Sequence, residues 1–226
     1  MAKSRTLGSI IGFPLLFVAI LWIAHLYKIT IPTGPGSLGI YPRELFGLKG
    51  IITAPLSHGD FHHLISNSVP LLVTLTIISW FYRRVSIYSF VLIYVLTGAA
   101  VWLFGRSVFH IGASGVVYGL VSFIFWSGVF RRNLKSIILS LIIVVMYSGY
   151  FYGILPNQEG ISWESHLFGA IVGVYVAYLL KGMVESDEIT RDPWADETDE
   201  QNFFLKRDQF DLTKEERRFT GFEDDA

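Results

Sequence analysis

Three groups of polar residues occur where long apolar stretches begin, and their types could support nucleophilic catalysis. Ser114 stands among small residues, His166 opens an apolar stretch, and His63 precedes Asn67 by four residues. On a helix, side chains at that spacing face the same way. A histidine within about 3 Å of a serine hydroxyl can accept its proton and make the serine a nucleophile. His63, Asn67 and the backbone N–H of Ser114 could then stabilise the oxyanion formed when an amide is attacked.

Small residues follow His166 at a regular spacing. Gly169 and Gly173 lie three and seven residues after it, on the same helical face. A Gly-x-x-x-Gly pair lets two helix backbones approach closely in a membrane. We expect the segment around Ser114 and Gly115 to be the partner of this face.

No carboxylate completes a catalytic triad in the sequence. Glu164 is two residues before His166, so on a helix it points roughly 200° away, and Asp60 lies in a loop. The pattern therefore predicts a serine–histidine dyad. Tyr118, four residues after Ser114, is expected to pack on the imidazole ring.

The composition shows what must position these residues. Residues 1–182 contain only 12 basic and 4 acidic side chains, whereas about a quarter of a soluble domain is charged. Lipid must therefore surround this part of the chain. Six stretches reach the roughly 20 apolar residues needed to cross a bilayer, which predicts an all-α membrane protein with spans at about 10–31, 63–82, 86–104, 112–130, 135–155 and 163–181.

Alternate connections between these spans are basic, which predicts an orientation. The positive-inside rule places both termini in the cytoplasm. The long loop 32–62 then lies outside, as do the starts of the second, fourth and sixth spans.

Each of the three polar groups alone also fits a structural role, as a packing site or an interhelical hydrogen bond. Their coincidence at one outer depth favours catalysis, because polar side chains in a membrane span usually serve function.

The remainder of the chain, 183–226, differs in composition. It holds 6 basic and 15 acidic residues, and a segment so charged is predicted to be a disordered cytoplasmic tail. We therefore divide the chain into a membrane domain, 1–182, and this tail. The absence of cysteine excludes disulfides, thiolate metal sites and a cysteine nucleophile. The thinly spread basic residues argue against nucleic-acid binding.

Taken together, these motifs resemble those of the rhomboid family of intramembrane serine proteases. The resemblance covers the six-span core and implies Ser114 as nucleophile, His166 as general base, and His63 with Asn67 as oxyanion donors. It also implies that substrates enter sideways from the bilayer near the second and fifth spans. The matching patterns are His58-x4-His63-x3-Asn67, Gly112-x-Ser114-Gly115-x-x-Tyr118 and His166-x-x-Gly169-x-x-x-Gly173.

The resemblance also implies a setting for the protein. It predicts a multi-pass endopeptidase of the bacterial inner (plasma) membrane that cuts single-span or other transmembrane proteins, with no metal or cofactor. The active site would face the outer side. Two features depart from the family pattern. Pro42-Arg43-Glu44 stands where many members carry a Trp-Arg pair, and the acidic tail has no counterpart in the minimal core.

Two other functions are compatible with the sequence. The same fold could bind client helices without cutting them, although such a binder does not need the Ser114 and His166 pair. A metal-dependent membrane oxidase is the second alternative, because His58, His62 and His63 form a histidine box. Such enzymes need several boxes, however, and the other three of the six histidines are isolated.

Overall fold

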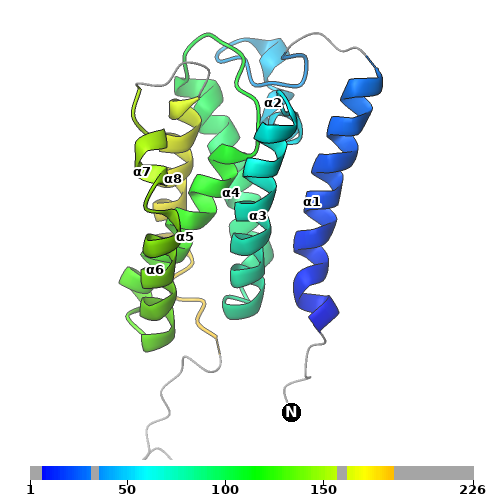
Figure 1. Ribbon diagram of the computed structural model, residues 1–226. Coiled ribbons are helices and arrows are strands. Elements are labelled where there is room, and N and C mark those ends of the chain that lie inside the picture. The colour runs from blue at the N-terminus through cyan, green and yellow to red at the C-terminus, as the bar shows by residue number, and fades with distance from the viewer. Residues whose placement is uncertain (1–6, 32–35, 157–161, 186–226) are drawn as a thin grey trace, which may run out of the picture. The chain divides into compact units, whose positions relative to one another are not determined.

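The structure is a computed structural model that describes residues 7–31, 36–156 and 162–185, and in these ranges it is built from helices (Figure 1). Ile40 and His110 pair in one isolated antiparallel bridge. The elements are α1 (Leu7–Thr30), η1 (Leu45–Gly47), α2 (Gly50–Thr53), η2 (Ala54–Leu56), α3 (Phe61–Phe81), α4 (Ser86–Phe104), α5 (Ser114–Arg131), α6 (Leu134–Tyr147), α7 (Tyr150–Gly153) and α8 (Trp163–Leu179).

Four helices of the described chain are long and apolar enough to cross a membrane. They are α3, α4, α5 and the part of α1 from Ile10 onward, and they match the first four predicted spans within a few residues. The other two predicted spans correspond to shorter helices, since α6 has 14 residues and α8 has 17. The all-helical fold class is confirmed, and the total of six spans stays a prediction.

The predicted fifth span, 135–155, is not one continuous helix. α6 ends at Tyr147, and only the single turn of α7 follows. Gly149 and Gly153 favour this break, because glycine is among the poorest helix formers. Pro156 stops the helix from resuming. The stretch 135–155 is therefore helical only in part, and its crossing of the membrane stays a prediction. The carbonyls of Tyr150 and Gly153 in α7 have partners on other helices.

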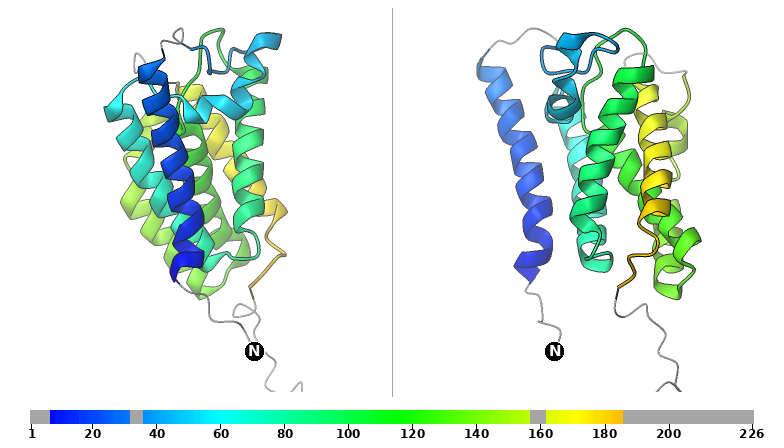
Figure 2. Two further views of the ribbon diagram at one scale, coloured as in Figure 1. Left: turned by 90° about the vertical axis from the view of Figure 1, so that its right-hand side faces the viewer. Right: turned by 180° about the vertical axis from the view of Figure 1, so that it is seen from behind.

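The central helix is α5, which packs against α3, α4, α6 and α8. α1 packs against α3 and η2, and the two views of Figure 2 show it beside α3. Two side chains define helix starts, since Asp60 accepts a hydrogen bond from the backbone N–H of His63 and Asn133 accepts one from that of Ser136. Of the helices that carry the predicted site residues, α3 is thus capped by a side chain, whereas α5 and α8 pack against each other.

The chain beyond α8 contacts the loop between α3 and α4. The Glu185 carboxylate accepts a hydrogen bond from the backbone N–H of Arg84 at 2.7 Å, and the Arg84 guanidinium donates to the Val184 carbonyl at 2.9 Å. The packed part therefore continues past the predicted boundary at residue 182. The predicted disorder of the tail from residue 186 onward falls outside the described residues.

These contacts predict two different truncation phenotypes. Truncation after Asp187 keeps Glu185, and the thermal stability of the enzyme should stay at the full-length value. Truncation after Met183 removes Glu185 and should lower the free energy of unfolding by about 1–3 kcal/mol, the usual range for a hydrogen bond to a charged group. Turnover per active site should be the same in both, because Glu185 lies beyond the far end of α8 from His166. Thermal melting and active-site titration test this, and equal melting of the two truncations would contradict it.

Candidate active site

Ser114 is the first residue of α5, and the turn that leads into this helix depends on the glycine at position 112. Gly112 has a φ of +97°, which L side chains rarely adopt. A Cβ at Gly112 would also collide with the ring of His63. Because the first N–H groups of a helix have no intrahelical partner, the backbone at Ser114 presents free donors beside its hydroxyl.

Glycines bring α8 into close contact with α5. A Cβ at Gly169 would collide with the Gly115 carbonyl, and one at Gly173 would collide with the Gly119 carbonyl. The two backbones therefore touch along two turns, as the Gly-x-x-x-Gly spacing suggests. This contact sets the first turn of α8, which carries His166, against the start of α5.

Ser114 and His166 form a hydrogen bond, and its direction follows from a third group. The Ser114 Oγ lies 2.8 Å from His166 Nε2, and His166 Nδ1 lies 2.8 Å from the Gly153 carbonyl oxygen. A carbonyl can only accept, so the Nδ1 nitrogen must carry the proton. Nε2 then accepts the serine hydroxyl, which is the tautomer that a general base requires.

The imidazole ring is also held from its face. The Tyr118 ring stacks on His166 with 4.1 Å between centroids and 9° between planes. The Tyr118 hydroxyl donates to the Tyr150 carbonyl at 2.8 Å, which fixes the stacking ring in turn. Tyr118 thus packs where the sequence suggested. The Gly153 carbonyl was not foreseen, because a backbone carbonyl has no residue-type signal.

His63 and Asn67 lie beside the serine on α3. The Asn67 amide is 4% exposed and donates one hydrogen bond to the His63 carbonyl at 2.8 Å, which leaves its second N–H. Together with Ser114, Tyr118 and His166 they line a cavity of about 760 Å³. The structure brings the predicted residues together around this cavity. The oxyanion role of His63 and Asn67 stays a prediction.

The two acidic residues considered for a catalytic triad, Glu164 and Asp60, have other partners. Glu164 is 3% exposed and forms an ion pair with the Arg106 guanidinium. The Asp60 carboxylate caps α3, and its hydrogen bond from the His63 N–H holds the Asp60 pKa below the ordinary value. Neither is hydrogen-bonded to His166 in the described residues, so the Ser114–His166 pair is oriented there by a carbonyl and a tyrosine.

The histidine box of the sequence does not form a metal centre in the described part of the chain. His58 is fully buried, with ring centroids 6.4 Å from His25 and 5.1 Å from His63. Burial, followed by the nearby His63, lowers the His58 pKa to about 4, although the Leu56 carbonyl opposes this. Among the residues that the structure describes, no three His, Cys, Asp or Glu side chains lie where they could hold a metal ion.

Comparisons with known proteins show which family the chain resembles. The family described as Rhomboid domain matches residues 46–182. Proteins from Mycobacterium tuberculosis (strain ATCC 25618 / H37Rv) and Mycobacterium bovis (strain ATCC BAA-935 / AF2122/97) are each 36% identical over 180 residues, covering 74% of this chain and 73% of the relative. A protein from Mycobacterium leprae (strain TN) is 34% identical over 175 residues, and the match covers 74% of this chain and 69% of that relative. All three are described as uncharacterized.

Proposed function

Because this chain belongs to the rhomboid family of integral membrane proteins, we propose that it is a serine endopeptidase that cuts other membrane proteins in or near their transmembrane segments. One observation carries the proposal. The Ser114 hydroxyl lies 2.8 Å from a histidine nitrogen whose tautomer is set by the Gly153 carbonyl. A serine that only helped helices to pack would not need this arrangement.

In the first half of the reaction, His166 Nε2 takes the proton as Ser114 Oγ attacks the carbonyl carbon of the scissile peptide bond. A C–O bond forms, and the carbonyl oxygen becomes an oxyanion. The backbone N–H of Ser114, the His63 ring and the second N–H of Asn67 are the proposed donors to it. The imidazolium then returns its proton to the amide nitrogen, the C–N bond breaks and an acyl-enzyme remains.

In the second half, a water molecule replaces the departed amine. His166 takes a proton from the water, which attacks the ester carbon and forms a second oxyanion. Collapse of this intermediate breaks the bond to Ser114 Oγ, which regains its proton from His166. Neither half needs a metal or another cofactor.

The membrane setting follows from charge placement. Arg83, Arg84, Arg131 and Arg132 flank the far ends of α3 and α5, whereas the dyad is at their opposite level. By the positive-inside rule, the dyad lies near the outer face of a bacterial inner membrane and both termini are cytoplasmic. A substrate helix reaching this depth must come from the bilayer, which is why we propose transmembrane proteins as substrates.

Replacing Asn67 with alanine should reduce turnover more than it weakens substrate binding. A donor directed at charge that appears only in the transition state acts on kcat, typically by about 10²–10³-fold. His63 shares this role in our proposal, so we expect the lower end of the range. Steady-state kinetics on a transmembrane substrate measure both constants. A loss confined to KM would exclude the oxyanion role.

The proposal is tested by reconstituting the purified protein in liposomes with a single-span substrate and sequencing the products. Cleavage within or beside the transmembrane segment is the expected result. A protein that binds the helix, leaves it intact and resists a fluorophosphonate would instead be the catalytically silent binder of client helices.

A further inference from the structure

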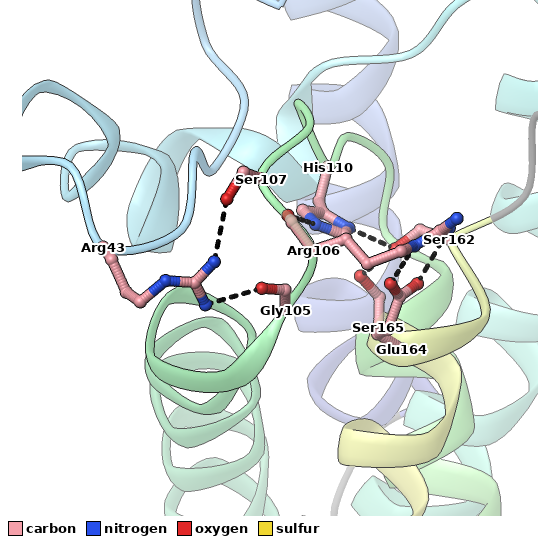
Figure 3. Close-up of polar contacts among 8 residues, drawn as sticks. All are labelled: Arg43, Gly105, Arg106, Ser107, His110, Ser162, Glu164 and Ser165. Carbon is pink, nitrogen blue, oxygen red and sulfur yellow. Dashed lines mark hydrogen bonds and ion pairs between the residues drawn. The ribbon is translucent and has the colours of Figure 1, made fainter.

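The start of α8 is joined to the loop before α5 by two connections that no sequence motif had indicated (Figure 3). In one, the guanidinium of Arg106 forms an ion pair with Glu164 through two nitrogens. In the other, His110 Nδ1 lies 2.5 Å from Ser162 Oγ, which lies 2.6 Å from Ser165 Oγ. We call these five residues the α8 latch.

The hydrogen-bond direction in the latch is determined. His110 Nε2 lies 3.0 Å from the Arg106 carbonyl oxygen, which can only accept. Burial lowers the pKa of His110, which favours the neutral ring. Nε2 therefore carries the proton, and Nδ1 accepts from the Ser162 hydroxyl. Ser162 in turn accepts from Ser165, the residue directly before His166.

Ser162 uses its hydroxyl in an unusual way. It occupies the N-cap position of α8, where a serine hydroxyl normally accepts from the N2 or N3 backbone N–H and contributes roughly 1 kcal/mol. Here the Ser162 side chain makes no capping bond and binds His110 instead. The Ser162 hydroxyl therefore ties the start of α8 to the loop of His110 rather than stabilising the helix locally. Such a departure from the usual local preference is expected at functional sites.

The loop that holds the latch is itself anchored on its other side. Arg43 donates to the Gly105 carbonyl and to the Ser107 hydroxyl, each at 2.8 Å. The backbone of His110 pairs with Ile40 through two bonds of 2.9 Å. The latch therefore connects α8 to a loop that is fixed to the long outer segment after α1 (Figure 3).

From this arrangement we infer that the α8 latch positions His166 against Ser114, a role that rests on the proposed protease function. His166 is in the first turn of α8, so any displacement of the helix start moves its ring directly. Proton transfer tolerates only about 2.6–3.2 Å between the two atoms, and a misplacement of about 1 Å can reduce the rate 10²-fold. The latch residues do not touch the reacting atoms. They are positioning residues.

The test is a matched pair of variants. Ser162→Thr keeps the hydroxyl, and Ser162→Val has the shape of that threonine with a methyl group in place of the hydroxyl. We expect Ser162→Thr to retain a kcat near wild type and Ser162→Val to lose about 10- to 100-fold, with KM unchanged. The kcat is expressed per active site, counted by exhaustive fluorophosphonate labelling, so that misfolded enzyme does not enter the comparison.

Two further variants separate an effect of the latch on kcat from a failure to fold and from a general effect of changing the loop. Arg106→Gln breaks the ion pair from an exposed position, so it should fold even if Ser162→Val does not, and it should lower kcat with KM unchanged. Ser107→Ala removes a hydroxyl from the same loop, but Arg43 keeps its bond to the Gly105 carbonyl and His110 keeps its backbone pairing with Ile40, so the loop stays anchored and kcat should stay at the wild-type value.

Two results would show that the latch does not position His166, provided that the wild-type protein cleaves its substrate. One is equal kcat values in Ser162→Thr and Ser162→Val, and the other is equal losses of kcat in Ser107→Ala and the latch variants. A wild-type protein that neither cleaves nor reacts with the fluorophosphonate would overturn the proposed function, and the latch with it.

Discussion

Replacing Ser114 with alanine is expected to lower cleavage of a transmembrane substrate by about 10³-fold or more, because no other group can form the acyl-enzyme. In the described residues, the hydrogen bond of the Ser114 hydroxyl is to His166. Its removal opens little space, so the melting temperature should stay within a few degrees of wild type. Product formation in liposomes and thermal melting of the same preparations give both values.

The His166→Ala variant is the matched comparison. Residues that act as one catalytic unit are strongly non-additive, so the double variant should be no slower than either single variant. Near-wild-type cleavage by Ser114→Ala would remove the serine from the mechanism. Additive losses would mean that the two residues act separately.

The second large effect is expected at Gly169. A valine there must avoid the Gly115 carbonyl, which a Cβ would otherwise overlap, so α8 has to move away from α5. His166 then leaves the range in which it can accept the Ser114 proton. We expect cleavage to fall by more than 10²-fold and the protein to melt earlier, because the close backbone packing is lost.

Gly12→Val is a suitable control for this substitution. Gly12 also lies in an apolar helix, α1, but open space surrounds the position where its Cβ would be. Its activity and melting temperature should match those of the wild type. A fully active Gly169→Val enzyme would mean that the α5–α8 contact does not set the distance between serine and histidine.

Much of this architecture is readable from the chain because its signals are large. A bilayer requires about 20 consecutive apolar residues per span, so the long helices stand out, and α4 begins and ends where the sequence predicted. Helical spacing also placed Gly169 and Gly173 on the face of His166. Span positions and helical faces can therefore be predicted from neighbouring residues alone, without knowing which distant residues are in contact.

Other features could not be read because they depend on long-range packing or on the backbone. The break between α6 and α7 gives His166 a carbonyl partner at Gly153, and carbonyls are present at every residue. The hydrogen bond between His110 and Ser162 joins residues 52 positions apart. In the sequence, His110 is isolated from the other five histidines. The opposite charges of Arg106 and Glu164 on the outer side were the one signal that could have suggested the latch.

If His166 activates Ser114, a fluorophosphonate should label the serine, and this labelling can be measured without knowing any substrate. We expect the probe to add its mass to the Ser114 peptide of the wild-type protein, and to leave both Ser114→Ala and His166→Ala unmodified under the same conditions. Labelling of Ser114 in His166→Ala at the wild-type rate would contradict the account, since the serine would then be activated by another group.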